Sequence, residues 1–440
     1  MTSRSASRSI SQKARGPHLL RSTVLVTACV IMALRAPLLL RQPRFWAEEG
    51  KVYFAYAYAA DGIWRALLAP HQGYYHLFAN LATVLALLVP VRHAPMVTTL
   101  LAFAAQALPL AIVLWGKAPL WRTLPKSIVA VAIILLTPSS GECWLNSINS
   151  QFYLALSAAL LLLEKTPKTP WRRWSYRGIL ALASLSGPVT AFLTPLFVLR
   201  AWAHRSNREA GTQAWIVGAG AMLQLGIVLT SLESPPEGAV RFAGLGPANL
   251  LAVILNRTVV MPLASSHAAQ WASERLVQAH EAGADGAMTL ALMLALVALG
   301  TFLCWKQPPR QRYLLAASLL MTTLSTISAL ISPGQTKWVL VSPGAAIRYY
   351  YAPSVLFMLA VWGRVDPQPK RWRHPASLLV ALALAVSLVL GAVDYRSLMW
   401  PFVSADWPVW QDQVTIWETR PGYRLEIWPP RWDMQLVKWD

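Results

Sequence analysis

Two adjacent carboxylates, Glu48 and Glu49, stand within the string FWAEEG of residues 45–50. Like-charge repulsion and partial burial both raise the pKa of a carboxyl group, and a raised pKa suits a general base. Acidic residues also favour the first turn of a helix, so the same pair is typical of a helix start. We therefore expect either a catalytic base or a helix start here, on the surface of the molecule.

The string of residues 139–152 is unusually polar for a chain of this composition. It carries Glu142, Asn146, Asn149 and Gln151. Their carboxylate and amide groups suit hydrogen bonding to sugar hydroxyls or to a phosphate. Helix capping would account for one or two of these residues but not for the whole set. The string is therefore a candidate binding segment.

Three cations are candidates for holding a phosphate. Arg348 opens the run RYYY, Lys337 precedes it, and Arg257 lies in a separate loop. A forked guanidinium can bind two phosphate oxygens at once. Tyr349 and the tyrosines after it are also typical of the aromatic belt at a membrane interface. Both interpretations place the start of this run at a helix end near the membrane surface.

Long apolar runs separate these polar strings. The chain is 55% hydrophobic and 13% charged, against about a quarter charged in ordinary soluble domains. Barrel strands would alternate over about ten residues, which these runs do not, so they predict an all-α, polytopic membrane protein. The runs are long enough, or nearly so, to cross a hydrocarbon core of ~30 Å; examples are residues 22–40, 95–115, 213–230, 287–304, 313–331 and 375–391.

The positions of the basic residues set the orientation. Residues 77–90 form a short apolar stretch, and if it crossed, the basic cluster 165–177 would lie outside, against the positive-inside rule. We therefore predict a re-entrant or interfacial stretch there, and two short helices within 178–200, broken at Ser186-Gly187-Pro188. This gives about eleven transmembrane helices with more than half of the 39 basic residues inside.

The predicted organisation has three parts. Residues 1–21 form a basic cytoplasmic tail, residues 22–391 a transmembrane bundle, and residues 392–440 an outer C-terminal tail. Residues 250–255 predict an interfacial helix. In the tail, residues 414–417 and 423–428 alternate like short strands around a turn at Pro421-Gly422, and its tryptophans favour a membrane interface over stacking on sugar rings. The predicted outer loops are residues 41–95, 138–150, 232–286 and 332–348.

Several classes of protein and site are disfavoured. The basic residues lie in short clusters between apolar runs, so no soluble basic domain exists to bind nucleic acid. The three cysteines and eight histidines show neither a disulfide framework nor metal-ligand spacing. A transporter or lipid flippase would carry ionisable residues deep in its helices, and these are nearly absent away from helix ends.

The order of these parts resembles the GT-C superfamily of integral-membrane glycosyltransferases. The string FWAEEG of residues 45–50, followed by HQGYY of residues 71–75, looks like the aromatic–acidic–acidic–Gly and Gly-Tyr pattern of uncharacterised bacterial members. The run beginning at Arg348 resembles their late Arg-Tyr motif. His71 and Tyr74 thereby join the candidate substrate-binding residues. Better-known members carry aspartate in the first-loop motif, where this chain has two glutamates.

The resemblance implies an inverting transferase in the bacterial inner (plasma) membrane. Its donor would be a polyprenyl-phosphate-linked sugar, and its acceptor a glycan, lipid or protein at the periplasmic face. Glu48 or Glu49 would be the base, and Arg348, with Lys337 or Arg257, would stabilise the leaving phosphate. No cofactor is predicted, and the two carboxylates do not decide whether a divalent metal takes part. The rival functions are a polymerase or ligase of lipid-linked glycans, and a lipid or sugar transporter or flippase.

Overall fold

The computed structural model describes residues 3–231, 246–305, 307–331, 338–365, 375–397, 407–420 and 422–437. The described part is nearly all helical, with one two-stranded sheet. The first third of the chain forms α1 (Ser3–Arg35), α2 (Pro37–Arg41), η1 (Glu49–Phe54), α3 (Ala55–Ala59), α4 (Ile63–Leu68), α5 (Leu77–Ala86) and α6 (Ala94–Trp115).

The middle and last parts continue in the same style. After α6 come η2 (Pro119–Trp121), α7 (Leu124–Leu136), η3 (Gly141–Cys143), α8 (Ser150–Leu161), α9 (Pro170–Ser184), η4 (Pro188–Leu193), α10 (Thr194–Ala203) and α11 (Arg208–Thr230). The remaining elements are α12 (Pro247–Val253), η5 (Ile254–Val260), α13 (Met261–Ala264), α14 (Ser266–Glu281), α15 (Asp285–Cys304), α16 (Pro309–Ile331), η6 (Val339–Val341), α17 (Arg348–Val365), α18 (Pro375–Ser397), α19 (Trp410–Thr419), β1 (Leu425–Ile427) and β2 (Trp432–Met434).

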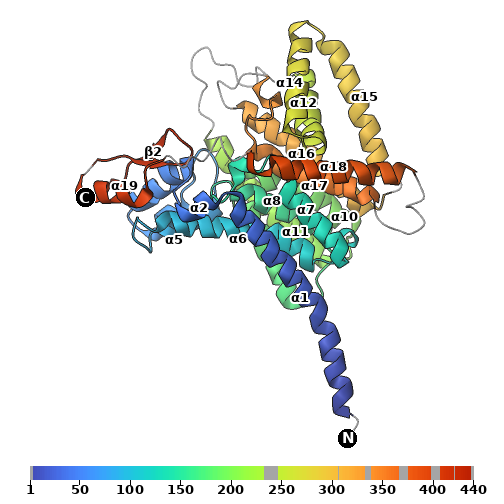
Figure 1. Ribbon diagram of the computed structural model, residues 1–440, viewed down its shortest axis with the longest axis horizontal. Helices are drawn as coiled ribbons and strands as arrows, with labels where there is room; N and C mark the ends of the chain where they lie inside the picture. Colours follow the sequence, from blue (N-terminus) through green and yellow to red (C-terminus); the bar gives the residue numbers. More distant parts are fainter. Residues whose placement is uncertain are drawn as a thin grey trace.

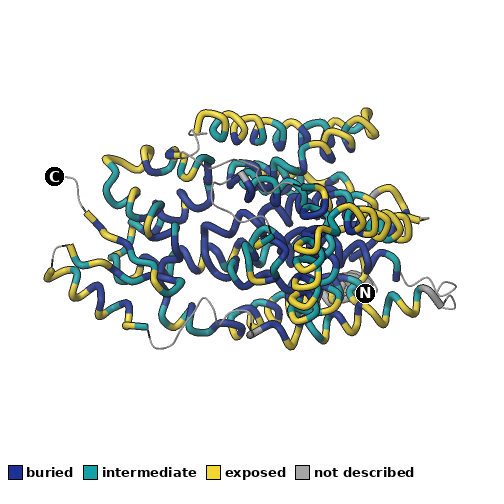
Figure 2. The backbone as a smooth tube through the Cα atoms, turned by 90° about the horizontal axis from the view of Figure 1, so that it is seen from above, coloured by how far each residue is buried: buried dark blue, intermediate teal, exposed yellow. Residues whose placement is uncertain are grey.

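The predicted all-α class is confirmed, and several of the helices are apolar and long enough to cross a membrane. Among the described residues there are seven such helices: His18–Arg35, Ala94–Trp115, Arg208–Thr230, Pro247–Ala264, Asp285–Cys304, Gln311–Leu330 and Ser377–Tyr395. Several of them carry exposed apolar side chains, such as Met222 and Val297. Lipid-facing helices expose such side chains, whereas soluble proteins rarely gather them into large patches. Figure 2 shows exposed residues along the peripheral helices and buried residues at the centre.

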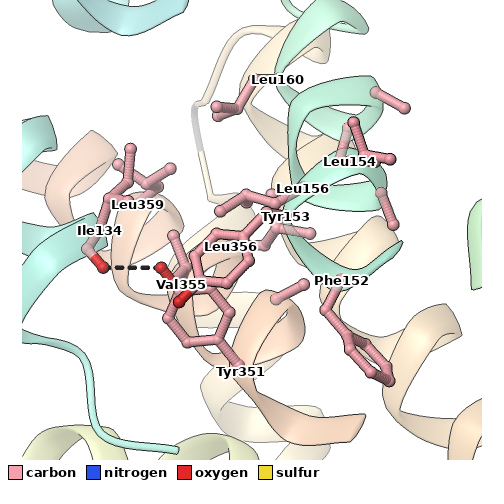
Figure 3. Close-up of a cluster of buried hydrophobic side chains, with 14 of the residues drawn as sticks. Ile134, Phe152, Tyr153, Leu154, Leu156, Leu160, Tyr351, Val355, Leu356 and Leu359 are labelled. Carbon is pink, nitrogen blue, oxygen red and sulfur yellow. Dashed lines mark hydrogen bonds between the residues drawn. The ribbon is translucent and has the colours of Figure 1, made fainter. Parts of the chain in front are cut away.

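The centre of the bundle is built by α8 and α17. Every residue of α8 is buried, and so is nearly all of α17. Between them the rings of Tyr153 and Tyr351 lie 4.8 Å apart, and the Tyr351 hydroxyl donates to the Ile134 carbonyl of α7 at 2.8 Å (Figure 3). Because this core is buried on all sides, it fixes the two segments that enter it: the loop before α8 and the start of α17.

The predicted break within residues 178–200 is confirmed. Helix α9 ends at Ser184, Gly187 adopts a left-handed φ of 90°, and η4 begins at Pro188. A side chain at Gly187 would collide with the Gln151 carboxamide, so both the backbone conformation and the space require glycine. The short stretch predicted not to cross contains α5, whose ten residues span about 15 Å.

Residues 250–255 belong to a longer helical run than the sequence predicted. The run Pro247–Ala264 is continuous and is itself long and apolar enough to cross a membrane. Asn256, Arg257 and Thr258 interrupt the apolar pattern of this run, yet all three are buried against the rest of the bundle. The polar side chains therefore conceal a candidate span, and the number of crossings stays a prediction.

The C-terminal tail packs onto the loop of residues 41–95. Strands β1 and β2 pair antiparallel, with Ile427 opposite Trp432, and the Trp428 N–H donates to the Phe45 carbonyl at 2.9 Å. The strand predicted within residues 423–428 is thus confirmed, whereas residues 414–417 are helical and that strand prediction is wrong. Figure 1 shows β2 and α19 beside the helices of the 41–95 loop, at one end of the molecule.

The error at residues 414–417 has a physical cause. Trp410, Gln413 and Val414 are buried at helical spacing. Trp410 and Val414 pack in one core with Phe45 of the 41–95 loop, and Gln413 hydrogen-bonds to Glu426, so these partners select the helix. Trp410 is fully buried in a core shared with Phe45, and Trp428 is fully buried in the central core that includes Trp46. The side chains of these two tryptophans therefore pack within the protein and are not exposed on its surface.

Candidate functional site

Three segments far apart in the sequence meet at the candidate site. They are residues 45–76, the polar string 139–152 and the start of α17. Hydrogen bonds tie the first to the second: Glu49 accepts from Ser147, and the His76 Nε2 donates to the Ile148 carbonyl at 2.8 Å. An ion pair between Glu142 and Arg348 ties the second to the third. The structure therefore brings together most of the residues that the sequence singled out.

Glu49 is buried and serves as an anchor between segments. Its Oε1 accepts from the Ser147 N–H at 2.7 Å and from the Ser147 hydroxyl, and its Oε2 accepts from the Trp46 N–H at 2.9 Å. Burial raises the pKa of Glu49, and the hydrogen bonds from Ser147 and Trp46, with Thr98, act in the opposite direction. The expectation that the acidic pair lies on the surface is therefore wrong for Glu49, because three donors hold it in the interior.

Glu48 is placed differently. It is only half-buried and immediately precedes η1, and no ion pair or hydrogen bond to its carboxylate occurs among the described residues. The Glu48 carboxylate interacts electrostatically with Tyr53: burial, Tyr74 and the Glu48 carboxylate together raise the pKa of the Tyr53 phenol well above its usual value. Of the two glutamates, Glu48 is therefore the one whose carboxylate is available to another molecule.

A row of side chains leads from Glu48 toward α17. Tyr53 interacts with Tyr74, and Tyr74 interacts in turn with Gln151, Tyr349 and Arg348. Burial and Tyr349 raise the pKa of Tyr74 to about 12, with Gln151, Arg348 and Tyr53 acting in the opposite direction. We call this set the Glu48–Arg348 row; it consists of Glu48, Tyr53, Tyr74, Gln151, Tyr349 and Arg348.

The amide of Gln151 is the least satisfied member of this row. Gln151 is buried, and its Oε1 accepts no hydrogen bond among the described residues that meets ordinary geometry. Its Nε2 makes only a long contact of 3.4 Å with the Ile148 carbonyl. Buried polar atoms are normally hydrogen-bonded, so an orphaned oxygen beside Tyr74 marks a position where a ligand hydroxyl could donate.

Arg348 stands at the first position of α17, half-buried, with its guanidinium against the face of the Tyr349 ring at 5.1 Å. Its Nη1 donates to Glu142 Oε1, and its backbone N–H donates to Glu142 Oε2 at 3.3 Å. Glu142 thus holds one edge of the guanidinium. The Nη2 and Nε groups donate to no other side chain among the described residues, which leaves the second edge for an anion.

Asn146 and Asn149 shape the loop. Their side-chain nitrogens both donate to the Glu142 carbonyl, at 3.0 and 2.9 Å, and Asn146 Oδ1 accepts from the Asn149 N–H. Both side chains are buried. Their hydrogen-bonding groups are therefore largely used in holding the Glu142 main chain, and the contact of these two residues with substrate stays a prediction.

The two histidines near Tyr74 also differ from each other. The His71 ring packs edge-on against Tyr53 at 4.6 Å and Tyr56 at 4.9 Å, and burial lowers its pKa. His76 is fully buried and caps α5 by accepting from the Ala79 N–H at 3.1 Å. Burial lowers the His76 pKa to about 4, so this ring is neutral and structural at physiological pH.

Arg257 lies apart from the row. It is fully buried, its guanidinium donates to the carbonyls of Leu340, Ser342 and Ala345, and it stacks on the Tyr350 ring at 4.3 Å. It thereby fastens the segment that leads into α17 and so positions Arg348 indirectly. No described contact joins Arg257 to Glu48 or Arg348. Lys337, the third predicted cation, lies outside the described residues.

Sequence reasoning missed Arg35. This side chain ends α1, is buried, and stacks between the rings of Trp144 and Tyr395 at 4.2 and 4.3 Å. It donates to the Ser140 hydroxyl and the Tyr395 carbonyl, both at 2.5 Å. The signal was available, since an arginine inside the apolar run 22–40 requires polar or aromatic partners within the protein.

No group of three or more His, Cys, Asp or Glu side chains that could hold a metal ion occurs in the part of the chain that the structure describes. The chain matches no family model, no curated protein and no solved structure.

Proposed function

We propose that this protein is an inverting membrane glycosyltransferase that moves a sugar from a polyprenyl-phosphate donor to an acceptor hydroxyl. The observation that carries the proposal is the Glu48–Arg348 row. It has a carboxylate without a partner among the described residues at one end and a guanidinium with a free edge at the other. Transfer from a lipid phosphate needs a base near the acceptor and a cation near the departing phosphate. The GT-C resemblance supports the same reaction.

In the proposed reaction the Glu48 carboxylate takes the proton of the acceptor hydroxyl. The acceptor oxygen then bonds to the anomeric carbon on the face opposite the phosphate. The bond from that carbon to the phosphate oxygen breaks, and its electron pair leaves with the polyprenyl phosphate. The sugar configuration is therefore inverted, and the proton remains on Glu48 until it passes to water.

Arg348 would stabilise the negative charge that builds on the departing phosphate. Glu142 occupies only the Nη1 edge of the guanidinium, so it would orient the Nη2 and Nε donors without consuming them. An interaction that strengthens as the bond breaks lowers the barrier to reaction beyond its effect on donor affinity. Gln151 and Tyr74, between the two ends, would hold the hydroxyls of the sugar or the acceptor.

The apolar helices around the site suit a donor that arrives by diffusion in the bilayer. With the N-terminus in the cytoplasm, the positive-inside rule assigns the row to the outer face of the plasma membrane, where a lipid carrier presents its sugar. The acceptor would then be a glycan, lipid or protein of the cell envelope. A flippase, by contrast, would need no carboxylate base beside a phosphate-binding arginine.

The proposal is tested by mass analysis of cell-envelope glycans. Cells carrying the wild-type chain, the Glu48→Gln variant or the Asp61→Asn control would be compared with cells lacking the gene product. Asp61 is an exposed acidic residue of the same loop, outside the row. A sugar mass increment present with wild type and Asp61→Asn, and absent with Glu48→Gln, is expected. An increment that survives Glu48→Gln would contradict the proposal.

A further inference from the structure

A basic hollow lies at the other end of the bundle from the Glu48–Arg348 row. It has a volume of about 630 Å³. Side chains from α1, the α6–η2 connection and the segment around the start of α9 line it. Its basic lining residues are His18, Arg21, Lys117, Arg122, Lys165 and Arg172.

No carboxylate lines this hollow among the described residues. The nearby Glu164 is buried and turned to other partners: its oxygens accept from the Lys117 N–H at 2.7 Å, the Ala118 N–H at 3.2 Å and the Trp121 indole at 2.8 Å. Lys117, Arg122 and Lys165 form no ion pair among the described residues and are exposed. None of these three charges is therefore paired with a carboxylate among the described residues.

Arg21 and Arg172 are half-buried, and neutral hydrogen-bond acceptors hold their guanidinium groups in place. Arg21 donates to the Leu114 and Arg122 carbonyls, the latter at 2.9 Å, and Arg172 donates to the Trp115 carbonyl at 2.8 Å. These neutral acceptors include the last carbonyls of α6, which need donors in any case. Each guanidinium keeps further N–H groups that donate to no acidic side chain, so the hollow presents positioned donors to an anion.

The hollow lies at the boundary of the apolar layer. Two candidate spans contribute to its lining. The span His18–Arg35 does so with its first residues, and the span Ala94–Trp115 with its last residue. Thr98, at the other end of α6, interacts with Glu49, so about 25 Å of helix separates the hollow from Glu49, the residue next to Glu48 of the row. Beside the basic residues stand large exposed apolar side chains, Leu19 at 70% and Trp171 at 70% exposure.

We infer that this hollow binds the phosphate-bearing headgroup of an anionic membrane lipid. A headgroup phosphate would sit among the lysines and arginines while its acyl chains lie along the exposed apolar sides of α1 and α9. Basic pockets between helices at a membrane surface suit such headgroups. A free phosphate would use the same cations but would gain nothing from Leu19 and Trp171. This inference is independent of the proposed transferase activity.

The test is native mass spectrometry of the delipidated full-length protein in neutral detergent, titrated with phosphatidylglycerol. Phosphatidylcholine is the neutral-lipid control and inorganic phosphate is the headgroup-only probe. The Lys117→Gln/Lys165→Gln variant should bind phosphatidylglycerol about 25-fold more weakly, at roughly 5-fold for each charge near the lipid phosphate. The matched control Lys168→Gln/Arg205→Gln also removes two exposed positive charges, outside the hollow, and should change affinity by less than about 2-fold.

The variant Lys117→Arg/Lys165→Arg keeps the charge and should keep wild-type affinity, which separates lost binding from misfolding. Equal weakening in the hollow variant and in its control would overturn the inference, because the effect would then be one of overall charge. Inorganic phosphate that binds as tightly as phosphatidylglycerol would also overturn it, in favour of a site for a soluble anion.

Discussion

Substitution of the two adjacent glutamates should have different effects: Glu48→Gln should reduce sugar transfer, and Glu49→Gln should reduce the stability of the fold. Glu48→Gln keeps the size of a half-buried side chain that makes no described hydrogen bond, so the free energy of unfolding should change by less than about 0.5 kcal/mol. Sugar transfer should fall by ~10²–10⁴-fold, the usual range for loss of a general base. Glu49→Gln should instead lower stability, and membrane yield and transfer should fall with it.

The magnitude for Glu49 follows from its three hydrogen bonds. Ser147 supplies two donors to Oε1, and the Trp46 N–H supplies one to Oε2 at 2.9 Å. Glutamine has one oxygen, so its amide nitrogen must face at least one of these donors. An orphaned buried donor costs ~1–3 kcal/mol, and the surviving hydrogen bonds lose their charge assistance, so we expect a loss of about 2–4 kcal/mol.

Thermal unfolding followed by tryptophan fluorescence in detergent, run beside an assay of sugar transfer, measures both quantities. Asp61→Asn, in the same loop, is the control and should match wild type in both. If Glu49→Gln unfolds like wild type, the buried-anchor role is wrong. If Glu48→Gln transfers sugar at the wild-type rate, Glu48 is not the base.

Three further predictions concern the rest of the site and the topology. Arg348→Ala should cripple turnover at saturating lipid-phosphate donor and Arg348→Lys should restore only part of it; wild-type turnover in the lysine variant would remove Arg348 from the site. The pKa of His76 is about 4 in the folded protein and near 6.5 in the unfolded chain, so the free energy of unfolding should fall by up to about 3 kcal/mol as the pH drops through this window. The fall should be smaller in His76→Asn, and equal pH profiles of the two proteins would refute this. A cysteine at Ser175 in a cysteine-free background should resist a membrane-impermeant thiol reagent in intact cells, and labelling would overturn the predicted orientation.

The sequence predicted the helical class and several boundaries because local physics determines them. Apolar runs of sufficient length give helices in any arrangement of the bundle, and the Gly187-Pro188 pair ends a helix whatever surrounds it. Local physics does not determine two other segments: residues 414–417, where the predicted strand is wrong, and the candidate span at Pro247–Ala264. In both, the packing partner decides: the 41–95 loop for Trp410 and its neighbours, and the bundle interior for Arg257.

The candidate site shows the same division. The residue types could be recognised in the sequence, but consecutive helical residues point about 100° apart, so the two glutamates face different surroundings. Which one does so depends on Ser147, a partner about a hundred positions away. Likewise Glu142 and Arg348 were each recognisable as candidates, yet their pairing comes from the burial of α8 and α17 against each other. No spacing in the sequence encodes that contact.

The central claim is that the sugar leaves its lipid phosphate at the Glu48–Arg348 row. Purified protein in proteoliposomes would be given polyprenyl-phosphate-linked hexose and pentose donors together with a cell-envelope acceptor fraction, and the lipid products would be analysed by mass. With wild-type protein we expect free polyprenyl phosphate and a glycosylated acceptor. With Glu48→Gln we expect the donor to stay intact. Donor that stays intact with wild-type protein and instead crosses the bilayer would contradict it, and would identify a transporter.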